Sequence, residues 1–338
     1  MVVVMKIGSS EEDIRGVEDM VHKAGGETHI VRGEVRSIVA LIGDTERFMD
    51  LPLSTLPGVD TVQRIGKPFK LVAREVHAAP SRVKIGKAEI SRDSFTLIAG
   101  PCAVESESQA MAAAVAAKDA GATILRGGAY KPRTSPYAFQ GLGQRGLEIL
   151  ADCREETGLP ILTEVVEARD VDGVAAIADA LQIGTRNMQN FALLTEAGRA
   201  GKPVMLKRGF SSTVEEWLMA AEYIAREGNA DIVLCERGIR TFEPSTRNTL
   251  DLGGMLVAQQ QSHLPVIVDP SHATGRRELV EPMARAALAA GADGVMIDVH
   301  DNPAEALCDG PQALVPDELK RLGAELAALG ATLGRPMS

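Results

Sequence analysis

From about residue 95 onward, short apolar runs alternate with longer segments that have the periodicity of amphipathic helices. The runs are rich in Ile, Leu and Val, and a glycine often separates a helix from the next run. Continuous apolar runs of this kind are typical of buried parallel strands. The predicted strands are residues 95–99, 122–125, 160–163, 180–183, 203–206, 231–234, 265–268 and 293–297. Eight βα units over roughly 240 residues predict a (β/α)8 TIM barrel of the α/β class.

A doubly wound open sheet is the competing fold for a chain of alternating strands and helices. No predicted strand leads directly into the G-x-G-x-x-G turn of a dinucleotide-binding domain, and the units number eight. Both observations favour the barrel.

Residues 1–66 follow a different pattern. Strand-like runs cover residues 2–7, 28–31, 37–41 and 61–65, and helical spacing covers residues 10–24 and 45–53. The order βαββαβ predicts a small ferredoxin-like α+β domain. We expect residues 67–93 to form a linker with an accessory strand pair over 82–90, and residues 94–338 to form the barrel domain.

Composition excludes several classes of function. The chain has 338 residues, 45% hydrophobic and only 3% aromatic, with a formal net charge of -10. This balance disfavours binding to nucleic acid or to an anionic membrane. The four cysteines are widely spaced, which predicts reduced thiols in a cytoplasmic protein rather than a disulfide framework. The N-terminal apolar stretch is too short for a signal peptide or a membrane span.

The residues that act on a substrate lie at the carboxyl ends of the strands in a TIM barrel. A polar or reactive group follows each of the eight predicted strands, whereas an inert barrel would carry such groups after only a few. The densest stretch, residues 126–135, holds three cations and the two aliphatic hydroxyls of Thr134 and Ser135. The predicted cations of the barrel mouth are Arg126, Lys131, Arg133, Arg186, Lys207 and Arg237, with Arg208 facing away.

Six cations around one cleft repel each other unless anions lie between them. They predict ligands with several negative charges, such as two phosphorylated substrates of which one also carries a carboxylate. We expect one or two of these cations to pair instead with Glu164, Glu236 or Asp269.

A second set of residues has the chemistry of a metal site. Cys102, His272, Asp298 and Asp309 offer a thiolate, an imidazole and two carboxylates, a mixture that suits Mn²⁺, Fe²⁺, Co²⁺ or Zn²⁺. Their spacing is not diagnostic, because a cysteine after a strand is more often a small buried hydrophobe. Three other residues satisfy the pattern equally well: Cys235, His300 and Cys308.

These motifs make residues 95–338 similar to the catalytic barrel of the 3-deoxy-D-arabino-heptulosonate 7-phosphate (DAHP) synthase family. The matching stretches are Ile98-Ala-Gly-Pro-Cys102, Arg126-Gly-Gly-Ala-Tyr-Lys-Pro-Arg-Thr-Ser135, Gly184-Thr-Arg-Asn187, Leu206-Lys-Arg-Gly209, Cys235-Glu-Arg-Gly238 and Asp269-Pro-Ser-His272. The N-terminal domain resembles the ferredoxin-like regulatory domain of one subgroup. The resemblance implies a transferase (EC 2.5.1.54) that condenses phosphoenolpyruvate with erythrose 4-phosphate and releases phosphate, in the first step of the shikimate pathway to aromatic amino acids.

The resemblance also assigns roles to individual residues. It implies that Arg126, Lys131, Arg186, Lys207 and Arg237 bind phosphoenolpyruvate, and that Arg133, Thr134 and Ser135 hold erythrose 4-phosphate. Cys102, His272 and Asp309 match metal-ligand positions, and Lys131 is expected to act as a proton donor or by electrostatics alone. Lys131, Cys102 and His272 are therefore the candidate catalytic residues.

One position departs from the family pattern, because Asp298 stands where these enzymes typically carry glutamate. The shorter side chain withdraws the carboxylate by about one C–C bond, so direct ligation would need backbone movement or a bridging water. Alternatively, Asp298 replaces the glutamate as a direct ligand, because carboxylate ligation tolerates modest shifts where a site is flexible.

Two other functions compete with DAHP synthesis. The first is 3-deoxy-octulosonate 8-phosphate synthase, whose relatives carry Ala-Asn-Arg-Ser-Ser where this chain has Lys131-Pro-Arg-Thr-Ser135. The second is a non-catalytic sensor of aromatic amino acids, which only Asp298 favours. By resemblance, the N-terminal domain is expected to bind tyrosine or phenylalanine, and the chain to form a homo-oligomer, most often a tetramer.

Overall fold

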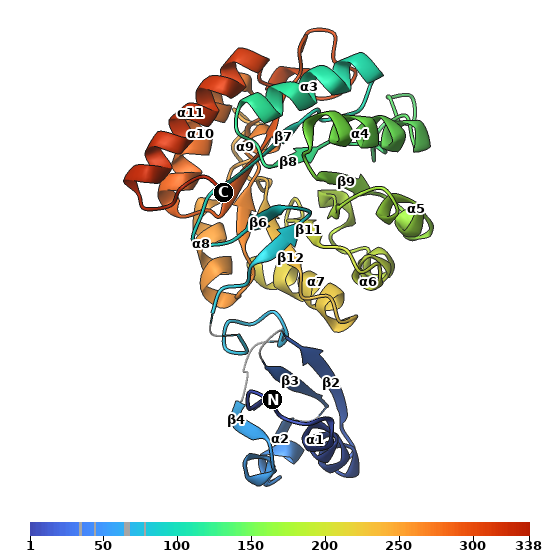
Figure 1. Ribbon diagram of the computed structural model, residues 1–338, viewed down its shortest axis with the longest axis vertical. Helices are drawn as coiled ribbons and strands as arrows, with labels where there is room; N and C mark the ends of the chain where they lie inside the picture. The colour runs from blue at the N-terminus through green and yellow to red at the C-terminus, as the bar shows by residue number, and fades with distance from the viewer. Residues whose placement is uncertain (34–35, 44, 64–67, 78) are drawn as a thin grey trace.

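The computed structural model describes residues 1–33, 36–43, 45–63, 68–77 and 79–338. The chain forms a small N-terminal lobe and a large barrel, joined by a segment that runs between them (Figure 1). In the described part of the chain, no helix combines the length and the apolar character needed to cross a membrane.

The N-terminal lobe is a four-stranded antiparallel sheet with the strand order β2-β3-β1-β4. Its elements are β1 Val2–Met5, α1 Glu11–Lys23, β2 Glu27–Arg32, β3 Ser37–Ile42, α2 Thr45–Met49, η1 Leu53–Thr55 and β4 Val59–Gln63. This connectivity is the predicted ferredoxin-like arrangement. The helix predicted over 45–53 ends early because Pro52 disfavours helical geometry in the residue before it. The predicted end of the last strand at Ile65 and the boundary at 66–67 lie outside the described residues.

The large lobe is a closed barrel of eight parallel strands, ordered β7 to β14 around the axis. The strands are β7 Thr96–Gly100, β8 Ile124–Arg126, β9 Ile161–Val165, β10 Ala180–Ile183, β11 Val204–Lys207, β12 Ile232–Glu236, β13 Val266–Val268 and β14 Gly294–Asp298. The predicted TIM barrel with a ferredoxin-like domain is therefore confirmed.

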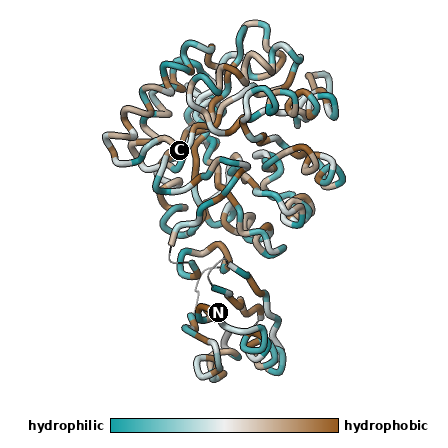
Figure 2. Tube along the Cα trace, viewed as in Figure 1, coloured by the Kyte–Doolittle hydropathy of each residue, from teal (hydrophilic) through white to brown (hydrophobic). Residues whose placement is uncertain are grey.

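Helices surround the barrel on its outer face, as Figure 1 shows. They are α3 Glu107–Asp119, α4 Gln144–Thr157, α5 Val171–Ala175, α6 Phe191–Arg199, α7 Val214–Arg226, α8 Leu252–Gln261, α9 Pro270–Thr274, α10 Arg277–Ala290 and α11 Pro316–Thr332, with the short 3-10 turns η2 Ala168–Asp170, η3 Thr185–Asn187 and η4 Gly310–Gln312. Figure 2 shows apolar residues concentrated along the barrel strands, with polar residues frequent on the outer turns.

One apolar layer fills the half of the barrel interior that is nearer the amino ends of the strands. Every strand contributes one buried residue to it: Ile98, Ile124, Leu162, Ala180, Met205, Val233, Ile267 and Met296. The hairpin of β5 Val83–Ile85 and β6 Ala88–Ile90 packs four buried side chains against this layer. The hairpin thereby closes the amino end of the barrel, which leaves the carboxyl end as the open mouth.

The segment that follows the N-terminal lobe is anchored to the outside of the barrel by buried polar groups. The carboxylate of Glu222, on α7, accepts the backbone N–H groups of Lys70, Leu71 and Val72 at 2.9, 2.8 and 3.1 Å. His263, which follows α8, contacts the Leu71 carbonyl through Nε2 at 2.9 Å and the Ser81 hydroxyl through Nδ1 at 2.7 Å. Burial lowers the pKa of His263 to about 4, so this imidazole is neutral in the folded protein at neutral pH.

We predict that this histidine makes the protein sensitive to acid. Histidine in the unfolded chain has a pKa of about 6.5. The contribution of the neutral His263 ring to the free energy of unfolding is therefore complete above pH 6.5. About 3 kcal/mol of it is lost as the pH falls towards 4. The urea concentration at the unfolding midpoint should therefore decrease as the pH is lowered from 6.5 to 4.5. His263→Gln, which cannot take up a proton, should flatten this dependence. Replacing the exposed His22 by glutamine should leave the pH profile unchanged. An unaltered profile in His263→Gln would contradict the assignment.

Candidate active site

Alternate residues of the barrel strands point inward, and those near the carboxyl ends form the base of the site. Residues two positions apart point to the same side of a strand. The residues that lie two positions beyond the apolar layer are therefore also turned inward, near the carboxyl mouth, and most are polar: Arg126, Glu164, Gln182, Lys207, Cys235 and Asp298. Arg208, at the adjacent position on β11, faces outward as predicted, where it pairs with Glu236 at 2.9 Å and Asp251 at 2.8 Å.

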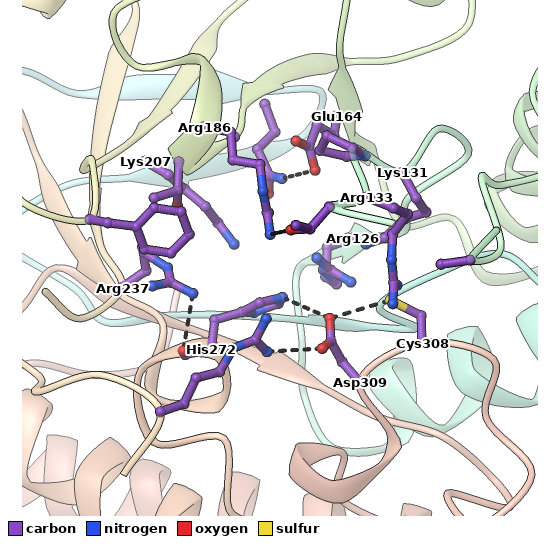
Figure 3. A pocket seen from close by; sticks show the side chains of 18 of the residues that line it. Arg126, Lys131, Arg133, Glu164, Arg186, Lys207, Arg237, His272, Cys308 and Asp309 are labelled. Atoms are coloured by element: carbon purple, nitrogen blue, oxygen red, sulfur yellow. Dashed lines mark hydrogen bonds and ion pairs between the residues drawn. The ribbon is translucent and has the colours of Figure 1, made fainter. Parts of the chain in front are cut away.

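A cavity of about 310 Å³ opens at this mouth (Figure 3). All six predicted cations line it, together with Thr134 and Ser135 from the loop after β8. Its wall also includes three residues that the sequence analysis did not place there: Arg247, Phe210 and Gln182. Arg247 lies on the long loop before α8, far along the chain from any strand end, so no local pattern distinguishes it from other loop arginines. Glu164, predicted only as an ion-pair partner, lines the cavity as well.

Only part of the positive charge is neutralised within the protein. Lys207 Nζ pairs with Asp269 Oδ2 at 2.6 Å, and Arg126 Nη1 pairs with Asp298 Oδ1 at 3.3 Å. The expectation that one or two cations pair internally is therefore confirmed for Asp269, whereas Glu236 pairs with Arg208 instead.

Four cations of the cavity lack a carboxylate partner: among the described residues, Lys131, Arg133, Arg186 and Arg237 have no carboxylate at ion-pair distance. Lys131 and Arg133 contact the thiols of Cys102 and Cys308 instead, which leaves Arg186 and Arg237 most available to a ligand. Arg186 Nη2 donates to Thr134 Oγ1 at 3.3 Å, and Arg237 Nη2 donates to the His272 carbonyl at 3.1 Å. Burial, against the attraction of Asp269, lowers the pKa of Arg237. A bound anion would relieve this excess of charge, so the cavity suits phosphate or carboxylate groups.

The predicted metal-ligand residues gather on one side of the cavity. Cys102 follows β7, His272 lies on α9, and Asp309 precedes η4. Cys102 Sγ is 3.2 Å from Asp309 Oδ2 and 3.7 Å from His272 Nε2, and the latter two atoms are 3.7 Å apart. The structure therefore brings three of the four predicted ligands together.

Asp298 lies on the other side of the histidine ring. Its Oδ2 is 3.5 Å from His272 Nδ1, and Asp269 Oδ2 is 2.9 Å from the same nitrogen. Asp298 is fully buried and also accepts a hydrogen bond from Gln312 Nε2 at 2.7 Å. Two carboxylates thus lie within ion-pair distance of Nδ1, which makes no hydrogen bond of good geometry, while Nε2 faces Cys102 and Asp309. Carboxylates in such positions are common behind metal-ligating histidines.

The sequence analysis offered Cys235, His300 and Cys308 as alternative members of this set, and of these three only Cys308 lies beside it. Cys308 Sγ is 3.8 Å from Cys102 Sγ and 3.3 Å from Asp309 Oδ2. Cys235 is buried inside the barrel, where it packs against the apolar layer, and His300 pairs with Glu105 at 3.4 Å.

The protonation states of the cluster follow from its neighbours. Burial alone would lower the pKa of His272, but the carboxylates of Asp269 and Asp298 outweigh it and raise the pKa to about 9. Burial opposes ionisation of Asp309, yet His272, Arg247 and Lys131 hold its pKa well below the usual range. The hydrogen bond with Cys308 and burial raise the pKa of Cys102, whereas that hydrogen bond lowers the pKa of Cys308.

The cluster fits a divalent transition metal on chemical grounds. Two sets of donor atoms lie within 4.8 Å of one another: Cys102, His272 and Asp298 form one, and Cys102, Cys308 and Asp309 form the other. Asp309 is also the one non-glycine residue of positive φ, 55°, in the described part of the chain. Such backbone strain concentrates where a side chain must be held in a functional position.

Both lobes match family models. The DAHP synthetase I family matches residues 73–333, and the DAHP synthase ferredoxin-like domain matches residues 1–67. The phospho-2-dehydro-3-deoxyheptonate aldolase of Thermotoga maritima is 48% identical over 334 residues, which cover 99% of each chain. A 2-dehydro-3-deoxyphosphooctonate aldolase of Acidithiobacillus ferrooxidans is 36% identical and covers 65% of this chain and 83% of that protein.

Solved structures give the same result. The crystal structure of the Thermotoga maritima DAHP synthase superposes with a TM-score of 0.79 at 46% identity, over all of this chain and 99% of that one. A truncated form of that enzyme covers 80% of this chain and 99% of its own, with a TM-score of 0.75.

We predict that Asp269→Asn weakens metal binding while the protein stays folded. The carboxylate holds His272 Nδ1, caps α9 by accepting the His272 backbone N–H at 2.9 Å, and neutralises Lys207. An amide keeps the shape but loses the charge, so affinity for Zn²⁺ should drop by about 10- to 100-fold. Competition with a chromophoric chelator measures the affinity, and circular dichroism checks the fold. Asp301→Asn, at an exposed carboxylate beside His300, is the matched control; equal affinities in the two variants would contradict the assignment.

Proposed function

The chain belongs to the DAHP synthetase I family, and from this premise we propose that it condenses phosphoenolpyruvate with erythrose 4-phosphate to give DAHP and phosphate. The observation that carries the proposal is the identity of 48% to a phospho-2-dehydro-3-deoxyheptonate aldolase, over nearly the full length of both proteins. We further propose that this reaction is the entry step of the shikimate pathway to the aromatic amino acids.

The charge of the cavity supports two anionic substrates. Arg126, Lys131, Arg186, Lys207 and Arg237 are proposed to bind phosphoenolpyruvate, and Arg133, Thr134 and Ser135 to bind erythrose 4-phosphate; all eight line the same cavity. The hydrogen bond from Arg186 to Thr134 joins the two proposed groups. Two substrates held side by side react as if in one molecule, which supplies much of the rate.

The proposed reaction forms one bond between carbon atoms and breaks one between carbon and oxygen. C3 of phosphoenolpyruvate attacks the aldehyde carbon, whose oxygen becomes an alkoxide and takes a proton, while positive character develops at C2. Water adds to C2 and gives up a proton. The hemiketal then expels phosphate by cleavage of the C2–O bond, which leaves the ketone of the product.

Lys131 is better suited to an electrostatic role than to proton donation. Its Nζ donates to the Cys102 carbonyl at 2.9 Å and to Cys102 Sγ at 3.2 Å. Burial alone would lower the pKa of Lys131, but the negative charge of Cys102 and Cys308 outweighs it and raises the pKa. An efficient general acid has a pKa near the working pH. We therefore propose that the ammonium of Lys131 stabilises negative charge that develops in the cavity.

A divalent metal is proposed as the cofactor, with Mn²⁺, Fe²⁺, Co²⁺ or Zn²⁺ as candidates. Cys102, His272 and Asp309 would hold it, and Asp298 is the fourth residue proposed from the sequence. Bound there, such an ion supplies Lewis-acid polarisation to a carbonyl oxygen.

The choice of sugar rests on two features of this chain. Relatives named 2-dehydro-3-deoxyphosphooctonate aldolase match about two thirds of it at 36% identity, whereas a DAHP synthase ferredoxin-like domain matches residues 1–67. The Lys131-Pro-Arg-Thr-Ser135 segment, which lines the cavity, also favours the four-carbon sugar.

We propose, on the family resemblance alone, that the ferredoxin-like domain binds tyrosine or phenylalanine and inhibits the barrel. A homotetramer in the cytoplasm is proposed on the same basis. The four free cysteines agree with a reducing compartment.

The proposed activity predicts a clear sugar preference. In a phosphate-release assay with phosphoenolpyruvate, erythrose 4-phosphate should give a kcat/KM at least about 100-fold higher than arabinose 5-phosphate, because polar contacts to a substrate discriminate strongly. The reverse preference would identify the chain as a 3-deoxy-octulosonate 8-phosphate synthase. Absence of phosphate release with either sugar would favour the sensor.

Arg186→Ala should impair the use of phosphoenolpyruvate. Loss of a charge-assisted hydrogen bond of about 1.5–3 kcal/mol should lower kcat/KM by roughly 10- to 150-fold. Arg240→Ala is the matched control. Arg186 and Arg240 both stack on the ring of Phe210, at 5.5 and 4.6 Å from its centre, but Arg240 does not line the cavity. Steady-state kinetics on both variants test the role. If Arg186→Ala keeps the parent kcat/KM, Arg186 does not bind phosphoenolpyruvate.

A further inference from the structure

We propose that Cys308 is a metal ligand in this chain, and that its thiolate takes the coordination position expected of Asp298. The inference rests on the metal dependence proposed above. It concerns a residue to which the family resemblance assigns no role and which the sequence offered only as one of three interchangeable alternatives.

Four donor atoms lie along the wall of the cavity, each near at least two of the others: Cys102 Sγ, Cys308 Sγ, Asp309 Oδ2 and His272 Nε2. In a tetrahedral site with metal–sulfur bonds of about 2.3 Å and metal–nitrogen or metal–oxygen bonds of about 2.0–2.2 Å, two sulfurs lie about 3.8 Å apart and the other pairs about 3.4–3.6 Å apart. The two sulfurs here are 3.8 Å apart. The Asp309 oxygen is 3.2 and 3.3 Å from them. His272 Nε2 is 3.7 Å from both Cys102 Sγ and the Asp309 oxygen.

Five of the six edges of a tetrahedron are therefore close to the lengths that a metal requires. The sixth edge joins Cys308 and His272, which approach the same Asp309 oxygen from opposite sides (Figure 3). A metal among the four donors would draw this last pair together.

Asp298 is occupied by other contacts. Its Oδ1 pairs with Arg126, its Oδ2 accepts from Gln312, and its backbone N–H donates to Ser271 Oγ at 3.1 Å. Its carboxylate faces Nδ1 of His272, whereas Cys102 Sγ and Asp309 Oδ2 face Nε2. One imidazole binds a single metal through one nitrogen, so a metal on Nε2 leaves Asp298 to orient the ring through Nδ1.

Each anionic donor of the proposed set has its own cation. Lys131 Nζ contacts Cys102 Sγ at 3.2 Å, Arg133 Nη1 contacts Cys308 Sγ, and Arg247 Nη1 pairs with Asp309 Oδ1 at 2.9 Å. These cations would balance the negative charge that a second thiolate adds to the site. Two thiolates, an imidazole and a carboxylate favour Zn²⁺, Co²⁺ or Fe²⁺ over Mn²⁺.

The experiment counts sulfur ligands on the full-length protein. The protein is stripped with chelator and reloaded with Zn²⁺ or Co²⁺, and X-ray absorption measures the number of sulfur neighbours. The parent protein and Asp298→Asn should both show two sulfurs at about 2.3 Å. Cys308→Ser should show one, and its thiolate-to-Co²⁺ absorption band should lose roughly half of its intensity. Cys153→Ser, which removes a buried thiol on α4 far from the site, should keep two.

Affinity provides a second measurement. Cys308→Ser should bind Zn²⁺ more than about 100-fold more weakly, beyond the 10- to 100-fold effect of losing an outer partner. Cys308→Asp, which restores a charged donor without sulfur, should recover part of the affinity while the sulfur count stays at one. Circular dichroism confirms that each variant is folded.

The outcomes separate this inference from the proposed function. One sulfur in the loaded parent protein, with full condensation activity, overturns the role of Cys308 and leaves the proposed reaction intact. Two sulfurs in Cys308→Ser also overturn it. Condensation by protein that binds no metal would overturn the metal dependence and this inference with it.

Discussion

Two fully buried carboxylates, Asp269 and Asp298, organise the mouth of the barrel. A buried charge is tolerated only where partners replace its lost hydration. Asp269 pairs with Lys207 and Asp298 with Arg126, which ties two strand-end cations to fixed positions. The same carboxylates hold one nitrogen of His272. The other nitrogen can then only point towards Cys102 and Asp309, so the candidate metal cluster depends on charges that lie beneath it.

Charge is divided across the cavity. The thiols, His272 and Asp309 occupy one side, where Lys131, Arg133 and Arg247 approach them. Arg186 and Arg237 are supported by the ring of Phe210, at 5.5 and 4.9 Å from its centre, and form no ion pair with a described carboxylate. The cavity therefore places thiol, imidazole and carboxylate groups, which suit a transition metal, beside positive groups that suit an anion. The arrangement is what a condensation of two phosphorylated substrates requires.

The departure at position 298 and the cysteine at 308 have a common physical explanation. An aspartate reaches less far than a glutamate, and in the structure the Asp298 carboxylate stays below the histidine ring, held by Arg126 and Gln312. Cys308 lies next to Asp309 and reaches the same oxygen that faces Cys102. The thiol at position 308 thus lies beside the Cys102 and Asp309 donors, whereas the shorter residue at position 298 stays on the Nδ1 side of His272.

The sequence by itself determined the architecture, because apolar runs and helical periodicity report burial directly. The strand predicted at 180–183 has those bounds in the structure. Other strands continue through a polar residue, as at Arg126, Lys207, Glu236 and Asp298, because backbone pairing does not stop where side-chain hydrophobicity does. The strand-end rule also identified six of the seven lysines and arginines that line the cavity. Only the tertiary structure decided which nitrogen of His272 faces which acid, that Arg247 enters the cavity, and that Cys308 rather than Cys235 or His300 joins the cluster. Those contacts join residues that are far apart in the chain, and their distances are set by packing that no local pattern records.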